Sequence, residues 1–246
     1  MDQNAAETVA LPAPAGVAAG AKPLACPIRW NRSRRARRIS LRIDARAGEV
    51  VVTLPPRAAR RAGMALLNTH AAWVRDRLAA LAPPIPFAPG AEVPLAGVPH
   101  RIRLATPGEG GGAEARLEPG AIVVPGPEEA VAERVAAFLK AEARRRIQTL
   151  ATGHAAALGV RPKGVRLKDT RSRWGSCAPD GTLAFSWRLV MAPDWVLDYV
   201  VAHEVAHLRE LNHSERFWAH VARLTPHRDA AVAWLRDNGP GLLRVG

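Results

Sequence analysis

The sequence predicts an α+β fold: a β-hairpin and meander with helices, followed by a more helical core. Three observations predict it. Short runs of alternating apolar and polar residues lie between residues 28 and 124 and are separated by Gly, Pro and Asp. A long helical pattern covers 127–158, and an apolar helical pattern covers 195–208. The expected core therefore contains a long helix, a small antiparallel sheet, a histidine-bearing helix and C-terminal helices.

The expected organisation has three parts. Residues 1–24 are rich in Ala, Pro and Gly and show no periodicity, which predicts a disordered leader. Residues 25–126 are expected to form a β-rich subdomain with one helix, and residues 127–246 the helical core. With 246 residues, 48% of them hydrophobic, the chain is long and apolar enough to bury a substantial core in one composite domain or two.

The first β segments are expected to form a β-hairpin with arginines along one face. Residues 28–30 are expected to be a short strand, and residues 39–43 and 50–54 a hairpin around a turn at 44–48. An arginine-rich run joins the first strand to the hairpin. It is interpreted either as a solvated surface or as a contact for anions or nucleic acid, and its residues are Arg34, Arg35, Arg37 and Arg38.

The following elements are read from periodicity and turn signals. Residues 58–81 are expected to form one helix, which the prolines after it end. Residues 89–125 are expected to form a small antiparallel sheet or meander. Acidic residues at 128 and 129 favour the start of the long helix, and Gly159 ends it. Asp180 and Gly181 predict a hairpin turn in a second β unit over 164–190.

Charge and cysteine content limit the class of protein. The net charge of +13 indicates either a nucleic-acid or other polyanion partner, or a solvated basic surface in an arginine-rich chain. No apolar run approaches the roughly 18–20 residues needed to cross a membrane, so no membrane partner is expected. The first residues lack a basic region and an apolar run, so no secretory signal is expected, and the chain has only two cysteines, Cys26 and Cys177. A cytoplasmic location is therefore expected.

The most informative motif is His-Glu-x-x-His at residues 203–207. At 3.6 residues per turn, His203 and His207 lie about 40° apart on one helix face and can share a metal ion. Glu204 lies about 100° from His203, so it can miss the metal and still reach a water bound to it. This set suits Zn²⁺, which accepts neutral imidazole nitrogens, and Glu204 is the expected general base.

A catalytic zinc normally has three protein ligands, so a third is required. His213 would lie about 240° from His207 on a continuous helix, and it can reach the metal only if the helix ends first. We expect Asn212 to adopt a left-handed turn and Ser214 to cap a new helix. Glu210 and His220 are weaker candidates for the third ligand.

The strand region before this helix carries a second group of candidate residues, for substrate binding. An edge strand beside a peptidase cleft can pair with an extended peptide, and a glycine in it allows close approach of another backbone. The residues concerned are Trp174, Gly175 and Ser176. Cys177 has no identified base and is expected to pack as a small apolar residue.

These motifs together resemble the YgjP-like family of metallopeptidases, which is related to SprT-like and WLM domains. The resemblance rests on residues 34–43, on Arg-Trp-Gly-Ser-Cys at 173–177, and on residues 197–218 with their two histidine motifs. It covers roughly residues 28–238. It implies a minigluzincin-like zinc metallopeptidase core, a peptide or protein substrate, zinc ligands at His203, His207 and His213, and Glu204 as general base.

The main interpretation is therefore a zinc-dependent hydrolase, a metallopeptidase in which Glu204 deprotonates a metal-activated water. Three alternatives stay open at this point. The first is a metal-dependent nucleotide or phosphoester hydrolase, although the motif contains few carboxylates. The second is a nucleic-acid-associated SprT-like protease, and the third is a binding module with a structural zinc.

Overall fold

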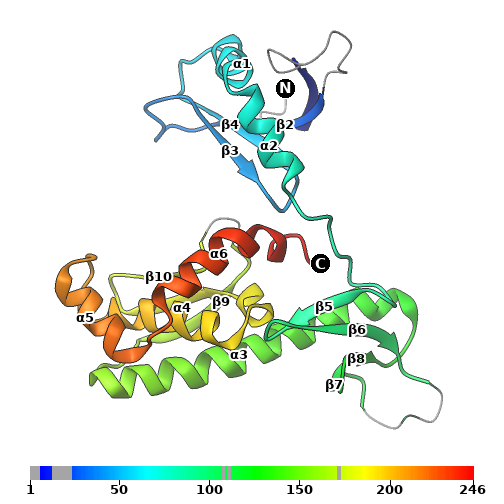
Figure 1. Ribbon diagram of the computed structural model, residues 1–246, viewed down its shortest axis with the longest axis vertical. Helices are drawn as coiled ribbons and strands as arrows, with labels where there is room; N and C mark the ends of the chain where they lie inside the picture. The colour runs from blue at the N-terminus through cyan, green and yellow to red at the C-terminus, as the bar shows by residue number, and fades with distance from the viewer. Residues whose placement is uncertain (1–5, 13–23, 107–108, 110–111, 171–172) are drawn as a thin grey trace. The chain divides into compact units, whose positions relative to one another are not determined.

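The computed structural model describes residues 6–12, 24–106, 109, 112–170 and 173–246. The chain forms two compact units, Met1–Pro83 and Pro84–Gly246 (Figure 1). The boundary lies within the proline-rich segment at 83–86 and not at 126, where the sequence had placed it. The physical reason is a shared core: the strands after residue 90 bury Val93, Ile102 and Ile122 in the same apolar cluster as the long helix.

Unit 1 contains a four-stranded mixed sheet with the order β1-β2-β4-β3. The strands are β1 (Ala6–Leu11), β2 (Leu24–Arg32), β3 (Ser40–Asp44) and β4 (Glu49–Leu54). The expected hairpin is present as the antiparallel pair β3–β4, whereas β2 runs parallel to β4.

The N-terminal strand corrects the prediction of a leader that is disordered throughout. Within residues 1–24, Ala6–Leu11 pairs in antiparallel register with β2. Its apolar side chains explain why: Leu11 is fully buried in the core of unit 1, and Val9 packs against that core. The rest of the predicted leader, residues 1–5 and 13–23, lies outside the described residues.

Two helices cover this sheet where one was expected. They are α1 (Arg60–Thr69) and α2 (Ala71–Ala79), and the helical geometry is interrupted at His70. The Thr69 hydroxyl donates to the Ala65 carbonyl oxygen at 3.0 Å, an interaction that tends to bend helices. Leu67 of α1 and Val74 of α2 are fully buried against the sheet.

Unit 2 begins with a second four-stranded sheet of order β5-β6-β8-β7. Its strands are β5 (Glu92–Leu95), β6 (Val98–Leu104), β7 (Arg116–Glu118) and β8 (Ala121–Val124). The sheet is mixed and not antiparallel as expected, because β8 lies inside the sheet beside β6 and runs parallel to it.

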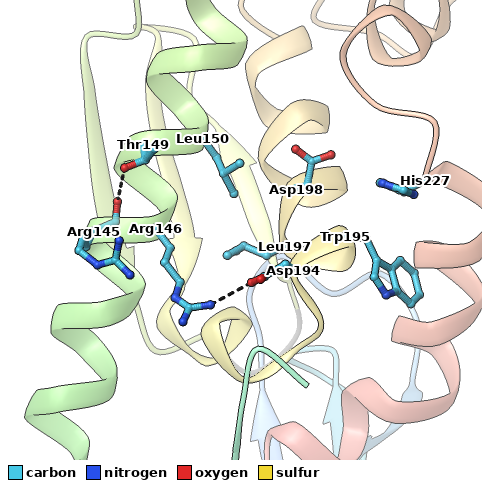
Figure 2. A pocket seen from close by; sticks show the side chains of 9 residues that line it. All are labelled: Arg145, Arg146, Thr149, Leu150, Asp194, Trp195, Leu197, Asp198 and His227. Carbon is cyan, nitrogen blue, oxygen red and sulfur yellow. Dashed lines mark hydrogen bonds and ion pairs between the residues drawn. The ribbon is translucent and has the colours of Figure 1, made fainter. Parts of the chain in front are cut away.

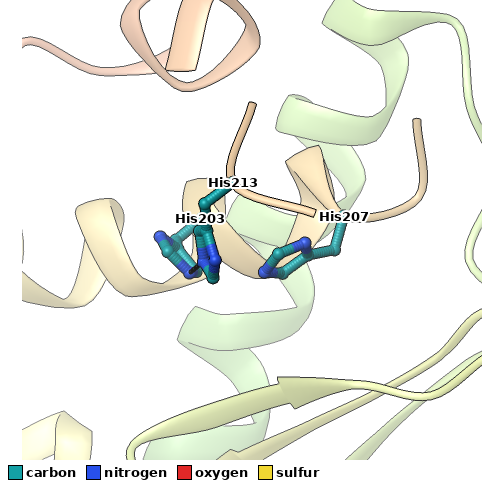
Figure 3. Close-up of side chains that lie close together, drawn as sticks. All are labelled: His203, His207 and His213. Atoms are coloured by element: carbon teal, nitrogen blue, oxygen red, sulfur yellow. Dashed lines mark hydrogen bonds between the residues drawn. The ribbon is translucent and has the colours of Figure 1, made fainter. Parts of the chain in front are cut away.

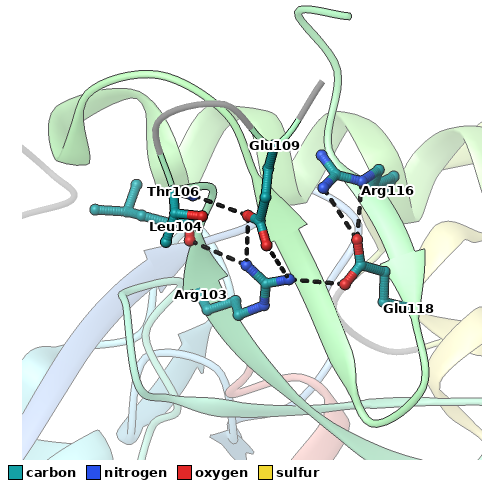
Figure 4. A network of polar contacts seen from close by, with 6 residues as sticks. All are labelled: Arg103, Leu104, Thr106, Glu109, Arg116 and Glu118. Atoms are coloured by element: carbon teal, nitrogen blue, oxygen red, sulfur yellow. Dashed lines mark hydrogen bonds and ion pairs between the residues drawn. The ribbon is translucent and has the colours of Figure 1, made fainter. Parts of the chain in front are cut away.

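A surface network connects β6 to β7. The Arg103 guanidinium donates to Glu109 at 2.8 Å and to Glu118 at 2.7 Å, and Arg116 donates to Glu118 at 3.0 Å (Figure 4). The pairing with Arg103 lowers the pKa of the exposed Glu109 to about 2. These side chains are about one-third exposed, so the network orders the strand ends and adds little stability.

The predicted long helix is present as α3 (Val131–Leu158), preceded by the short helix η1 (Glu128–Ala130). It ends at Gly159, whose φ of 63° is the left-handed conformation that glycine permits. A buried residue recurs every fourth position from Val131 to Ala155, which gives α3 a continuous apolar stripe that winds slowly round the helix.

A three-stranded sheet follows, with strand order β10-β11-β9. The strands are β9 (Gly164–Lys168), β10 (Gly175–Cys177) and β11 (Thr182–Ser186). The turn at Asp180 and Gly181 is present, and the Asp180 carboxylate accepts a hydrogen bond from the Thr182 N–H at 3.0 Å. This sheet is also mixed, since β9 runs parallel to β11. Among the described strands, β10 forms one edge.

The last elements are η2 (Trp187–Met191), α4 (Asp194–Ala206), α5 (Glu215–Leu224) and α6 (Arg228–Leu242). Helix α4 lies at the centre of unit 2 and packs against α3, α5, α6 and β10 (Figure 1). Nine of its residues are buried, including Glu204. Over the described part of the chain, no helix is long and apolar enough to cross a bilayer.

Two glycine substitutions should change stability in opposite directions. A Cβ at Gly63 in α1 would lie 2.7 Å from the Trp30 ring, so Gly63→Ala should lower the free energy of unfolding by about 1–3 kcal/mol. A Cβ at Gly153 in α3 meets no atom within 4 Å, so Gly153→Ala should raise it by about 0.5–1 kcal/mol through helix propensity. Scanning calorimetry of both variants checks this. Equal effects would contradict the packing of α1 on Trp30.

Candidate metal centre

Three imidazoles converge at the C-terminal end of α4 (Figure 3). One ring nitrogen from each of His203, His207 and His213 lies within 4.8 Å of the others. The Nε2 atoms of His203 and His213 are 3.2 Å apart. The structure therefore brings together the three residues that the sequence predicted as ligands.

This convergence requires α4 to end early. The last helical residue is Ala206, and His207 is the C-cap. The N–H groups of Arg209 and Glu210 both donate to the Ala206 carbonyl oxygen, which tightens the turn. The Arg209 side chain then donates to the Leu158 and Gly159 carbonyl oxygens at 2.7 and 2.9 Å, and so ties the turn to the end of α3. Sequence reasoning missed Arg209, because nothing local marks its distant partners.

The second half of the reversal is partly as predicted. Ser214 caps α5, since its hydroxyl accepts from the Phe217 N–H at 3.3 Å. The left-handed conformation expected of Asn212 is wrong: of the described non-glycine residues, only Ala96 has a positive φ. Asn212 acts through its side chain, whose oxygen accepts from the Ser214 N–H at 3.0 Å.

Aromatic residues of α5 hold the three rings in place. Phe217 is fully buried, and its ring centroid lies 5.0, 4.5 and 4.7 Å from those of His203, His207 and His213. Trp218 stacks on His213 with a centroid separation of 5.5 Å. One apolar side chain therefore contacts all three imidazoles and restricts their orientations.

The hydrogen bonds of the rings fit a metal site. His207 Nδ1–H donates to the Glu210 carbonyl oxygen at 3.0 Å, which leaves the Nε2 lone pair free. His203 Nδ1 lies 3.5 Å from the Tyr199 hydroxyl. The Nε2 atoms of His203 and His213, 3.2 Å apart, lie at hydrogen-bonding distance and close to the spacing of two ligands on one cation. For comparison, tetrahedral zinc with Zn–N bonds of about 2.0–2.1 Å would separate its ligands by roughly 3.4 Å.

The electrostatic environment keeps His203 and His207 neutral. Burial, with the neighbouring His207 and His213, lowers the pKa of His203 to about 4. Burial also lowers the pKa of His207. Neutral imidazole is the form that binds a metal, so these two rings are available as ligands at neutral pH.

Glu204, the residue after His203, lies in a space that Gly175 of β10 provides. The residue is 7% exposed, and a Cβ at Gly175 would lie 2.5 Å from its Oε1 atom and 2.6 Å from its Cγ. Burial raises the pKa of Glu204 to about 7, and the charge of Arg173 partly opposes this shift. The absence of a side chain at Gly175 therefore makes room for the Glu204 carboxylate, a role that sequence reasoning did not identify.

The other candidates near the cluster have different surroundings. Trp174 packs against α6, where a Cβ at Gly239 would lie 3.0 Å from its ring. Ser176 is half-buried on the edge strand β10, and Cys177 packs against the core as expected. Both cysteines are free thiols, and a cytoplasmic location stays a prediction. The Glu210 carboxylate lies 3.5 Å from Arg216, and neither Glu210 nor His220 belongs to the metal-binding group found among the described residues.

A separate pocket of about 580 Å³ lies beside the N-terminal half of α4 (Figure 2). Arg146 pairs with Asp194 there at 2.9 Å, and the Asp198 carboxylate is bonded to His154 at 2.8 Å. None of the three clustered histidines lines this pocket. Its lining residues are Arg145, Arg146, Thr149, Leu150, Asp194, Trp195, Leu197, Asp198 and His227.

A family model described as the YgjP-like metallopeptidase domain matches residues 37–238. The chain belongs to the YgjP-like family. This confirms the resemblance drawn from the motifs, and it supports a metallopeptidase-type hydrolase that acts on a peptide or protein with a catalytic metal. The predicted anion-contacting arginines lie in unit 1, on the β2–β3 connection. Arg34 and Arg35 precede the matched range, and Arg37 and Arg38 fall within it.

Two further comparisons add less. One solved structure similar to this YgjP-like chain is the crystal structure of the metallopeptidase zymogen of Pyrococcus abyssi abylysin. The identity is 22%, the match covers 38% of this chain and 92% of that chain, and the TM-score is 0.34. No curated protein matches the chain.

The buried Glu204 should give metal-stripped protein a defined pH dependence. The pKa of Glu204 in the folded protein, about 7, lies above its ordinary value of 4.5, so protonation of this carboxyl stabilises the folded state. This stabilisation is fully present below pH 4.5 and is lost as the pH rises through 7. The free energy of unfolding of Glu204→Gln, relative to that of wild type, should therefore increase by about 2–3 kcal/mol as the pH rises from 4.5 to 7.5. Chemical denaturation of both proteins with chelator checks this. A pH-independent difference would contradict the burial of the carboxylate.

Proposed function

We propose that this YgjP-like protein is a zinc-dependent peptidase in which His203, His207 and His213 hold the metal and Glu204 is the general base. The observation that carries the proposal is the approach of three imidazoles to one point, with one ring nitrogen of each within 4.8 Å of the others. A buried carboxylate on the same helix completes the set. Three histidines leave one position of a tetrahedral metal open, as catalytic sites require.

Zinc bound there would supply Lewis acidity, which lowers the pKa of water and polarises the scissile carbonyl. The residues of the chain perform the other tasks. Glu204 takes the proton of the attacking water and returns it to the leaving amine, and its pKa of about 7 suits a group that must do both. Phe217 and the Glu210 carbonyl oxygen hold the imidazoles in orientation.

The substrate would be an extended peptide paired with β10. This strand forms an edge of the described three-stranded sheet, and its backbone passes directly beside Glu204 at Gly175. An edge strand can hold a peptide by main-chain hydrogen bonds, which do not depend on the peptide's sequence. The Trp174 carbonyl oxygen accepts from the Ser186 N–H of β11 at 2.8 Å, so backbone groups at alternate positions face inward. Gly175 would therefore offer its outward backbone groups to the peptide, with Trp174 and Ser176 on either side of it.

The phosphoester alternative has less support. Phosphoryl-transfer sites commonly hold Mg²⁺ through carboxylates, whereas the metal-binding group found among the described residues consists of imidazoles alone. We therefore favour peptide-bond hydrolysis.

Single substitutions should separate metal binding from catalysis. Glu204→Gln should keep one zinc per chain yet lower kcat about 10²–10⁴-fold, because general-base catalysis is lost. His213→Ala should lose both zinc and activity. Elemental analysis and hydrolysis of a fluorogenic denatured protein measure the two properties. His220→Ala is the matched control, since it removes a histidine outside the cluster; loss of zinc in that variant, or full activity in Glu204→Gln, would refute the assignment.

Gly175→Ala tests the space beside Glu204. The new methyl group would displace the carboxylate, so kcat should fall at least about 10-fold while zinc stays bound. Gly164→Ala is the control, because Gly164 lies in β9 of the same sheet and a Cβ there meets no atom within 4 Å. Equal activity of the two variants would show that Gly175 does not position the base.

A further inference from the structure

The positive charge of this protein is concentrated in unit 1. Residues 1–83 contain 14 Lys and Arg against five Asp and Glu, a net charge of +9. Residues 84–246 contain 21 Lys and Arg against 17 Asp and Glu, a net charge of +4 over nearly twice the length. A compositional preference for arginine in the whole chain would affect both units alike, so the asymmetry belongs to unit 1 itself.

Internal pairing occupies most of the acidic groups of unit 1. Asp44 and Glu49 are 1% and 7% exposed, and both accept from Arg29, at 2.9 and 2.5 Å. Glu7 accepts from Arg60 at 2.8 Å and from the Trp30 indole N–H at 2.7 Å. These carboxylates are therefore not free to neutralise the remaining arginines.

Seven exposed arginines lie on two segments that are hydrogen-bonded to each other. The Ser33 N–H donates to the Leu54 carbonyl oxygen at 3.0 Å, and Arg32 donates to the Pro55 carbonyl oxygen at 3.2 Å. These bonds join the β2–β3 connection to the segment that leads into α1. Among the described residues, no acidic side chain pairs with any of the seven. We call them the arginine cluster: Arg32, Arg34, Arg35, Arg37, Arg38, Arg57 and Arg61.

The start of α1 is locally unfavourable for cations. The first helical residues are Arg60 and Arg61, no acidic residue lies in the first turn, and no side chain caps the helix. Because a helix N-terminus carries partial positive charge, an arginine there is unfavourable unless an anion is near. Glu7 offsets Arg60, and Arg61 has no such partner among the described residues. A bound anion would remove this repulsion.

We propose that the arginine cluster binds the phosphate backbone of a nucleic-acid duplex. Guanidinium groups match phosphate oxygens with paired N–H donors, and closely spaced arginines match a repeating line of phosphates. Single strands usually need exposed aromatic rings beside the basic groups for base stacking. Trp30 is 6% exposed beneath Arg60, and Trp73, which is 40% exposed, lies on α2, outside the two segments that carry the arginine cluster. Membrane surfaces favour apolar anchors beside the basic groups, and the connection from 33 to 38 has none. This binding does not depend on the proposed peptidase chemistry.

The test is binding of the full chain to a fluorescently labelled 20-base-pair duplex, as DNA and as RNA, over a series of salt concentrations. Each phosphate contact contributes about 0.9 to the slope of log K against log salt. Replacing Arg34, Arg35, Arg37 and Arg38 together by Gln should lower that slope by about 2–4 and weaken binding at least about tenfold at low salt. The same four positions changed to Lys should keep most of the slope.

The matched control carries the same change in charge on unit 2. Its four positions are exposed and have no acidic partner among the described residues: Arg144, Arg161, Arg166 and Arg223, each changed to Gln. This variant should keep the wild-type slope and bind within about threefold of wild type. Thermal denaturation of all variants confirms that each is folded.

Three results would overturn the proposal. The first is absence of salt-dependent duplex binding by wild type. The second is an equal loss in the unit 1 and unit 2 variants, which would show an effect of net charge alone. The third is preference for another polyanion, seen as tighter binding to phosphatidylserine vesicles or as full competition by polyglutamate at equal charge.

Discussion

The reversal of the chain between His207 and His213 is the constraint on which the site depends. On a continuous helix, His213 would point about 240° away from His207, and the metal would have two ligands at most. Helix α4 ends at Ala206 because the turn after it is anchored elsewhere: Arg209 is bonded to the end of α3, and Ser214 starts α5. Phe217 of α5 then packs against all three imidazoles.

The proposed base has its own structural requirement. Glu204 lies against the edge strand, so its carboxylate occupies space that a side chain at position 175 of β10 would otherwise fill. Gly175 satisfies this requirement, and the low exposure that results raises the pKa of Glu204 toward neutrality. The two motifs, His-Glu-x-x-His and Trp-Gly-Ser-Cys, therefore pack against each other: the glycine on strand β10 leaves space for the glutamate on helix α4.

Local patterns in the sequence predicted much of this arrangement. Helical periodicity located α3 and α4, turn residues located the β3–β4 and β10–β11 hairpins, and residue spacing identified the three histidines. Features that depend on distant partners were missed. The pairing of β1 with β2, the parallel strands in all three sheets and the inclusion of β5–β8 in the core of unit 2 are examples. Arg209 and Gly175 belong to the same class, since their partners lie about 50 and 29 residues away in sequence.

The central claim is that three imidazoles bind one zinc ion at the end of α4. X-ray absorption at the zinc edge of the loaded protein measures the ligands directly. The account predicts three imidazole nitrogens at about 2.0–2.1 Å, one further light atom and no sulfur. A shell with two imidazoles, or a sulfur at about 2.3 Å from Cys177, would contradict it.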